Sequence, residues 1–196
     1  MTRIAAISRK TKETQIDIEL GLSPGEVRVS TGIPFFDHMV SQLGKHGGWT
    51  LRVAAKGDLE VDAHHTVEDV GISLGNALKE ALGDKTGISR FASVLIPLDE
   101  ALIELALDIS GRPYLSYEVE FPVDATPLGD PPFDPQLAEE FLRAFVTEAE
   151  ITLHVNMKSG RNTHHILEAT FKALARALKS ACKIEGSEIP STKGSL

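Results

Sequence analysis

The chain has little cysteine, an excess of acidic over basic charge and no long apolar run, and each of these features narrows its function. Cys182 is the one cysteine among 196 residues, so an internal disulfide is impossible. We expect it to be a small core side chain rather than a nucleophile. No stretch approaches the ~18 apolar residues of a membrane span, and polar sequence follows Met1 where a signal peptide would be apolar. The sequence therefore predicts a cytoplasmic protein.

Basic charge is scarce relative to acidic charge. The chain has 20 Lys and Arg against 28 Asp and Glu, a formal net charge of -8. Nucleic acids and acidic membrane surfaces select proteins with a basic face, so neither is expected as a partner. An anionic small substrate remains compatible with this charge if Arg or Lys side chains are placed locally. The composition, 42% hydrophobic and 24% charged, is that of a globular protein with a sizeable core.

The chain carries one motif twice. AHHTVE at residues 63–68 and THHILE at residues 163–168 each open a segment with the apolar stripe of a helix, and the residues after each motif, 70–82 and 170–182, are also similar. On a helix the first His and the Glu lie four apart and the second His and the Glu three apart, so their side chains can converge. Such a repeat indicates gene duplication.

The order of predicted elements supports the same duplication. Alternating patterns predict strands at 3–9, 14–20, 26–31 and 49–55, and again at 91–98, 101–110, 114–120 and 151–157. Helical patterns begin at Pro34, after Asp62, at about Gln136 and at the second motif. Each half is therefore β-β-β-α-β-α, and we expect one domain, 1–196, built from halves 1–86 and 87–196. The predicted fold class is α+β, a sandwich with sheets and helices in separate layers.

The two motifs supply ligands that divalent metals accept. Imidazole and carboxylate together suit Mn, Fe, Co or Zn, and the spacing is not that of zinc proteases. Adjacent helical residues point about 100° apart, so each His pair should serve two different ions. The register of residues 50–53 against 152–155 sets His38 opposite Glu140. The candidate ligands are His38, His64, His65, Glu68, Glu140, His164, His165 and Glu168.

Other interpretations stay open at this point. A single His pair at a helix start is more often a solvated polar face, but two copies with Glu at the same spacing favour metal binding. A non-catalytic metal-buffering protein needs only the paired motifs. A dinuclear hydrolase of phosphate esters is a third class, although such enzymes usually use Asp-rich ligand sets. Release of free phosphate would distinguish the hydrolase from other activities.

Several motifs together resemble a known family. They are TGIPFFDHM at 31–39, DAHHTVED at 62–69, HHILEATFKA at 164–173 and PSTKG at 190–194. Over nearly the whole chain the sequence resembles imidazoleglycerol-phosphate dehydratase. The resemblance implies a ribosomal protein S5 domain 2-like fold and the removal of water from imidazole glycerol phosphate to give imidazole acetol phosphate in histidine biosynthesis. It also implies two Mn(II) ions per active site and a homo-oligomer, a 24-subunit shell with sites between subunits.

The resemblance also assigns ligands to the two ions. One ion would take His38, His65, His164 and Glu168, and the other His64, Glu68, His165 and a residue of the helix before Ile151. Many family members have His at that last position, where this chain has Glu140. We expect the Glu140 carboxylate to substitute, although Glu139 and Glu140 could instead form a solvated helix face.

Substrate binding and proton transfer are assigned by the same resemblance. Arg supplies a fork of donors that matches phosphate. The route implied is a metal-bound imidazolate that expels the neighbouring hydroxyl, after which a carboxylate removes the adjacent proton. Glu13 is the leading candidate for that base, and Glu168 is the alternative. The substrate-binding set is Glu13, Gln42, His46, Arg90, Arg112, Ser191, Thr192 and Lys193.

Overall fold

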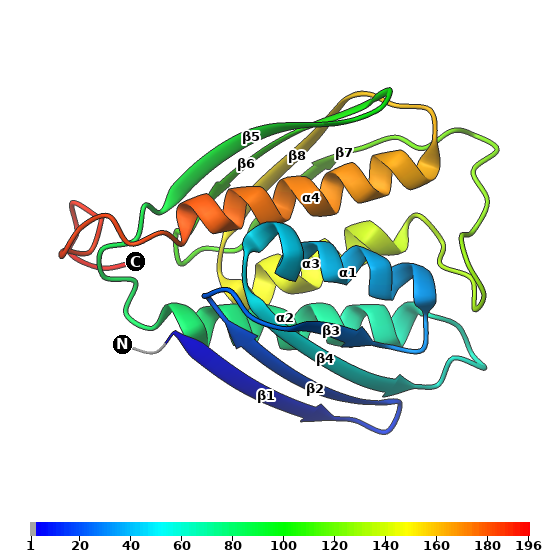
Figure 1. Cartoon of the computed structure of the whole chain (residues 1–196), viewed down its shortest axis with the longest axis horizontal. Coiled ribbons are helices and arrows are strands. Elements are labelled where there is room, and N and C mark those ends of the chain that lie inside the picture. Colours follow the sequence, from blue (N-terminus) through cyan, green and yellow to red (C-terminus); the bar gives the residue numbers. More distant parts are fainter. Residues whose placement is uncertain (1–2) are drawn as a thin grey trace.

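The computed structural model describes residues 3–196, which form two four-stranded sheets with four helices between them (Figure 1). The first half comprises β1 (Ile4–Lys10), β2 (Thr14–Gly21), β3 (Val27–Ser30), α1 (Pro34–Gly47), β4 (Thr50–Gly57) and α2 (His64–Leu82). The second comprises β5 (Phe91–Leu98), β6 (Ala101–Asp108), β7 (Tyr114–Glu118), α3 (Leu137–Ala149), β8 (Thr152–Ser159) and α4 (Thr163–Ala181).

The two sheets have the same topology. Their strand orders are β1-β2-β4-β3 and β5-β6-β8-β7, and in each the last two strands are parallel while the other neighbours are antiparallel. The predicted α+β sandwich of two repeated halves is therefore confirmed. Among residues 3–196 no helix is both long and apolar enough to cross a membrane. The cytoplasmic location stays a prediction.

Local side chains fix where the two His pairs lie. The carboxylate of Asp62 accepts a hydrogen bond from the backbone N–H of His64 at 2.7 Å, and the side chain of Asn162 accepts one from His165 at 3.2 Å. Asn162 is the N-cap of α4, Asp62 lies two residues before His64, and both bonds satisfy backbone donors that a helix start leaves free. Both His pairs therefore lie in the first turn of their helices, at the same end of the molecule (Figure 1).

The helices pack in two pairs, α1 with α4 and α2 with α3. Two glycines let α2 approach α3 closely. A Cβ added at Gly75 would lie 2.6 Å from the carbonyl oxygen of Phe145, and one at Gly71 would lie 2.7 Å from that of Phe141. These contacts bring the start of α3 beside the first turns of α2.

Substitution Gly75→Ala is expected to destabilise the protein. Alanine favours a helix interior by about 1 kcal/mol over glycine, but the clash with backbone requires the two helices to separate. Overpacking of this kind lowers the free energy of unfolding by about 1–3 kcal/mol. Urea denaturation would measure the change, with Glu80→Ala on the exposed face of α2 as the control. A gain in stability for Gly75→Ala would contradict the close approach.

Candidate functional site

Three predicted ligands come together where α1 crosses the start of α4. The Nε2 atoms of His38 and His164 lie 3.3 and 3.0 Å from the same carboxylate oxygen, Oε2 of Glu168. One ligand atom from each of the three residues lies within 4.8 Å of the others. Two imidazole nitrogens and one carboxylate at these distances could hold a divalent ion if it displaces the protons on the two Nε2 atoms.

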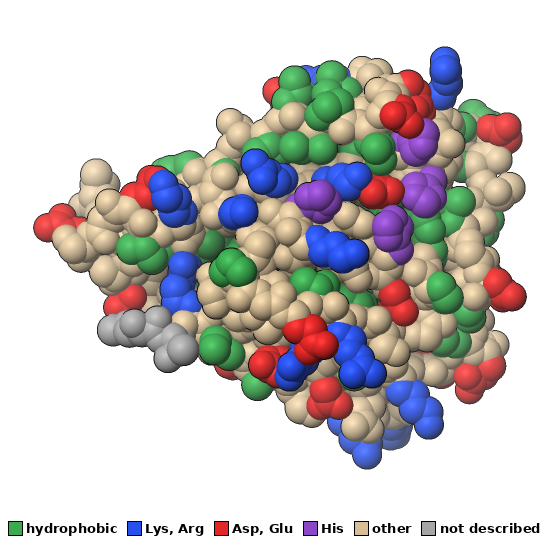
Figure 2. Space-filling model, viewed as in Figure 1, with side chains coloured by type: hydrophobic (Ala, Val, Ile, Leu, Met, Phe, Trp, Pro, Cys, Tyr) green, Lys and Arg blue, Asp and Glu red, His purple; other side chains and the backbone are tan. Residues whose placement is uncertain are grey.

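Glu168 is prepared to act as an ionised ligand. Burial raises the pKa of its carboxyl, but hydrogen bonds from Lys172 and His38 outweigh that effect and hold the pKa at about 2. The Lys172 ammonium lies 2.7 Å from Oε1, one helical turn along α4. Figure 2 shows His side chains gathered on this face of the molecule with Lys and Arg side chains beside them.

The equivalent place in the other helix pair contains Glu68 and Glu140. Both line one hollow of about 240 Å³ between α2 and α3. The neighbouring Glu139 instead pairs with Arg143 one turn along α3. The structure therefore separates the two adjacent glutamates: Glu139 makes an ordinary helix-surface ion pair, and Glu140 lies with Glu68. Whether Glu140 binds a metal stays a prediction.

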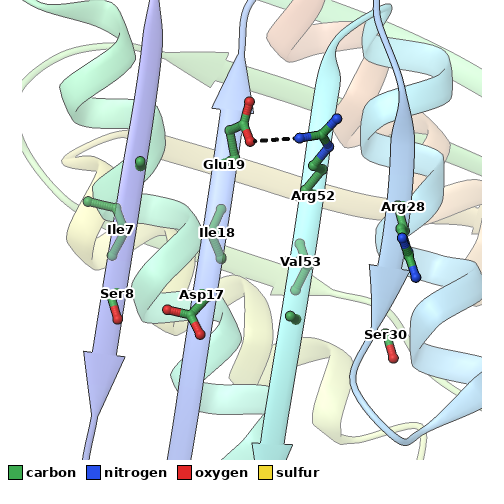
Figure 3. A pocket seen from close by; sticks show the side chains of 11 residues that line it. Ile7, Ser8, Asp17, Ile18, Glu19, Arg28, Ser30, Arg52 and Val53 are labelled. Atoms are coloured by element: carbon green, nitrogen blue, oxygen red, sulfur yellow. Dashed lines mark hydrogen bonds and ion pairs between the residues drawn. The ribbon is translucent and has the colours of Figure 1, made fainter.

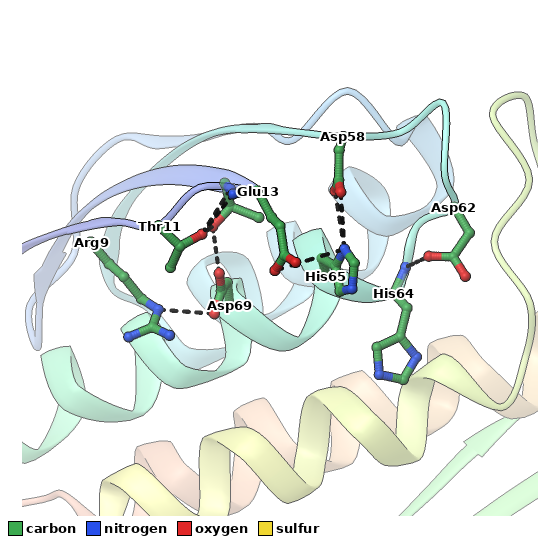
Figure 4. A network of polar contacts seen from close by, with 9 residues as sticks. Arg9, Thr11, Glu13, Asp58, Asp62, His64, His65 and Asp69 are labelled. Carbon is green, nitrogen blue, oxygen red and sulfur yellow. Dashed lines mark hydrogen bonds and ion pairs between the residues drawn. The ribbon is translucent and has the colours of Figure 1, made fainter.

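The two rings of each His pair lie nearly at right angles to each other. The ring centroids of His64 and His65 are 6.3 Å apart with planes at 85°, and those of His164 and His165 are 6.3 Å apart at 80°. His64 points to the opposite side from Asp58 and Glu13 (Figure 4). Neither second His joins the cluster that the resemblance assigns to it within this one chain.

Carboxylates contact the rings of His65 and His165. Nδ1 of His65 lies 3.1 and 3.2 Å from the two carboxylate oxygens of Asp58, and Nδ1 of His165 lies 2.8 Å from Oε2 of Glu100. The hydrogen bond with Asp58 raises the pKa of His65, and the one with His165 helps to lower the pKa of Glu100 to about 2. Neither carboxylate was predicted from the sequence.

The hairpin between β1 and β2 brings Glu13 to His65 (Figure 4). The buried carboxylate of Asp69 on α2 accepts hydrogen bonds from Arg9 at 2.9 Å and from the hydroxyl of Thr14, which ties both strands to the helix. Oε2 of Glu13 then lies 4.0 Å from Nδ1 of His65, and the Glu13 side chain is 55% exposed. Glu13 is therefore accessible to a substrate.

The residues predicted to bind phosphate share a different hollow. Arg90, Arg112 and residues 191–193 all line a space of about 280 Å³ beside the C-terminal segment. Arg90 has a structural role there, because its guanidinium donates to Asp108 at 2.7 and 3.1 Å and to the carbonyl oxygen of Pro190 at 2.8 Å. Arg112 and Lys193 line the same space and are not involved in that network.

Gln42 and His46 lie on α1, away from this hollow. The buried Gln42 amide donates to the carbonyl oxygen of His38 at 3.2 Å and lies 3.4 Å from its Nδ1, so it supports that ligand. Burial lowers the pKa of His46, and the positive charges of Lys172 and Arg176 lower it further. His46 is therefore neutral near pH 7 and is available as a hydrogen-bonding group.

The cluster of His38, His164 and Glu168 lies at one end of α4, and the hollow lined by Arg112 and Lys193 lies at the other. His164 is at the start of the helix. Ala181 is at its end, and its carbonyl oxygen accepts a hydrogen bond of 2.9 Å from the backbone N–H of Arg90. At 1.5 Å per residue the separation is roughly 25 Å. The substrate that the family resemblance implies, one imidazole ring with a three-carbon phosphate, would span at most about 10 Å, given bond lengths near 1.5 Å. One chain alone therefore cannot bring its metal-ligand cluster and its phosphate-binding hollow to the same substrate molecule.

A further hollow lies on the outer face of the first sheet, away from the helices that carry the His residues (Figure 3). It has a volume of about 580 Å³, and Asp17, Glu19, Arg28 and Arg52 are among its lining residues. Arg52 pairs with Glu19 at 3.2 Å across the strands. The greater volume of this hollow does not make it the site, because none of the predicted ligands or phosphate-binding residues lines it.

The fold and the site together define an α+β protein of two duplicated halves, with one cluster of His and Glu, two glutamates in the equivalent place of the other helix pair, and a separate cationic hollow. The imidazoleglycerol-phosphate dehydratase family profile matches residues 31–178. Imidazoleglycerol-phosphate dehydratases of Anaeromyxobacter sp. (strain Fw109-5) and Moorella thermoacetica are 54% and 52% identical, over 99% and 100% of this chain and 94% and 100% of theirs. The crystal structure of the Staphylococcus aureus enzyme is 37% identical with a TM-score of 0.82, covering 94% of this chain and 99% of that one. This chain belongs to the imidazoleglycerol-phosphate dehydratase family and is a hydro-lyase.

Proposed function

We propose that this protein removes water from imidazole glycerol phosphate to give imidazole acetol phosphate in histidine biosynthesis, with divalent manganese bound. The observation that carries the proposal is the combination of two features. One is a ligand cluster of His38, His164 and Glu168, and the other is a cationic hollow that contains Arg112 and Lys193. A substrate with an imidazole at one end and a phosphate at the other requires both.

The ligand types fit a pair of Mn(II) ions. His38, His164 and Glu168 would hold one ion, and His64, Glu68 and Glu140 would contribute to the other. The one cysteine is buried elsewhere in the fold, so soft thiolate ligation does not compete. Bound ions would supply Lewis acidity toward the imidazole ring of the substrate. A metal-buffering protein would not require the hollow beside the C-terminal segment.

We infer that each active site is completed by other copies of this chain. The rings of His65 and His165 contact Asp58 and Glu100 rather than the cluster of His38, His164 and Glu168, and the phosphate hollow lies roughly 25 Å from that cluster along α4. A homo-oligomer, such as the 24-subunit shell implied by the family resemblance, would place these parts side by side. Metal binding would then be coupled to assembly and to stability.

The first experiment tests for manganese-dependent dehydration. Metal-stripped protein is incubated with imidazole glycerol phosphate, with and without Mn(II), and imidazole acetol phosphate and free phosphate are both followed. We expect ketone product only with Mn(II) and no release of phosphate. Tight Mn(II) binding without product would favour the metal-buffering function, and phosphate release would favour a hydrolase. Product at full rate without metal would contradict the proposed role of the clusters.

A further inference from the structure

Two carboxylates contact the second His of each pair, His65 and His165, in the same way. Glu100 contacts Nδ1 of His165 at 2.8 Å, and Asp58 contacts Nδ1 of His65 at 3.1 Å. In both cases Nδ1 makes the hydrogen bond. Nε2 of His165 lies 3.7 Å from the exposed carboxylate of Asp99, beyond hydrogen-bond distance, so Nε2 is the ring nitrogen that can accept another partner. An imidazole with its proton on Nδ1 has its lone pair on Nε2, which is the arrangement a metal ligand needs.

We propose that Glu100 and Asp58 are positioning residues that fix the proton of His165 and His65 on Nδ1 and so present Nε2 of each ring to a divalent metal ion. This inference rests on the proposed function, because it assumes that both rings are ligands. The other ligands of that ion would come from another copy of the chain.

The two halves use residues from different places for the same contact. Glu100 immediately precedes β6, the second strand of its sheet, and Glu13 immediately precedes β2, the second strand of the other. Glu13 thus occupies the position from which Glu100 holds His165, but in the first half Asp58, which follows β4, contacts the His instead. Glu13 is thereby left 4.0 Å from His65, exposed and free to act on a substrate.

The surroundings of Glu100 determine what a glutamine would do there. Its other oxygen, Oε1, accepts hydrogen bonds from the backbone N–H groups of Asn162 at 2.8 Å and Arg161 at 3.3 Å. Backbone N–H groups can only donate, so in Glu100→Gln the amide oxygen must face them. The NH2 group then faces Nδ1 of His165 and donates to it. This moves the ring proton to Nε2 and blocks metal binding there.

Asp58 offers a contrasting case. Both of its oxygens lie close to Nδ1 of His65, and within residues 3–196 its carboxylate has no second hydrogen-bond partner. In Asp58→Asn the amide can therefore turn its oxygen toward Nδ1 and keep the ring proton in place. Replacing the carboxylate by an amide is therefore predicted to weaken metal binding strongly at residue 100 and only slightly at residue 58.

The test is a titration of metal-stripped protein with Mn(II), with the electron paramagnetic resonance signal of the free ion reporting what remains unbound. We expect two ions per chain for the natural sequence. Glu100→Gln should lower the affinity for one of the two ions by about 10–100-fold and leave the affinity for the other unchanged. Glu100→Ala should weaken it less, because the ring can again adopt either tautomer. Glu104→Gln on the outer face of β6, where Glu104 pairs with Lys158, is the matched control and should bind as the natural sequence does.

The order of the two Glu100 variants separates positioning from simple structural support. A purely structural role predicts that alanine, which loses the bonds to the start of α4, is worse than glutamine in both metal affinity and thermal midpoint. Metal affinity lower in Glu100→Ala than in Glu100→Gln, or unchanged affinity in Glu100→Gln, would overturn the inference and leave the proposed function intact. Absence of tight Mn(II) binding by the natural sequence would overturn both.

Discussion

Replacing Glu13 by glutamine should abolish most of the turnover while leaving Mn(II) binding intact. The side chain is exposed beside His65 and is held there by the hairpin that Asp69 ties to α2. A positioned general base contributes about 10²–10⁴-fold to a rate, and a neutral amide cannot accept the proton. Turnover at saturating substrate measures the loss, and the Mn(II) titration shows that the clusters are unchanged.

Glu26→Gln is a suitable control for this prediction. The Glu26 side chain is 57% exposed, close to the 55% of Glu13, but it pairs with Arg52 on the outer face of the first sheet. We expect near-normal turnover for this variant. Near-normal turnover in Glu13→Gln would instead reject Glu13 as the base.

Glu168 is the alternative base, and its environment argues against that role. Its carboxyl has a pKa of about 2, because hydrogen bonds from Lys172 and His38 overcome the effect of burial. A carboxylate of such low pKa accepts a proton poorly near neutral pH. The same low pKa suits a metal ligand, which must be ionised when it binds.

Two inactive variants should restore each other's activity when they share an oligomer. His164→Ala removes a ligand from the cluster, and Arg112→Ala removes a cation from the phosphate hollow. Each variant alone should be nearly inactive. If the two parts of a site come from different chains, random mixing gives an intact site in up to about a quarter of cases. Co-expression of the two variants with separate affinity tags, followed by purification through both, measures the recovered turnover.

The matched control for this experiment mixes Arg112→Ala with Lys193→Ala. Both residues line the same hollow, so every mixed site still has one defective hollow and no activity should return. A site built within a single chain would give no recovery in either mixture, because every chain then carries a defect. That result would contradict the inference, drawn from the separation of roughly 25 Å along α4, that two chains share each site.

The sequence determined the elements of this protein because their signals are local. Alternating apolar residues and turn residues placed the strands to within a few residues of their observed ends. One difference is β6, which was expected to run to residue 110 and ends at Asp108, where Ser110 turns the chain by bonding to Arg112 through its hydroxyl. The spacing of His and Glu in each motif fixed which side chains share a helix face.

Part of the site could also be predicted from residue spacing along the sequence. The offset between the halves predicted that His38 and Glu140 occupy equivalent places, and they do lie beside the corresponding helix starts. Lys172 was missed, although it lies four residues after Glu168 on α4, a spacing that itself predicts an ion pair. The identity of the metal stays a prediction.

Tertiary structure alone decided what faces each His and how far apart the parts of the site lie. Spacing along a helix sets the angle between His164 and His165, but it does not say which strand or loop packs against either ring. Glu100 meets His165 across 65 residues of chain, and the phosphate hollow forms only where the C-terminal segment folds against Arg90. Such contacts depend on the packing of sheets against helices, so no local pattern could have predicted that the cluster and the hollow lie at opposite ends of α4.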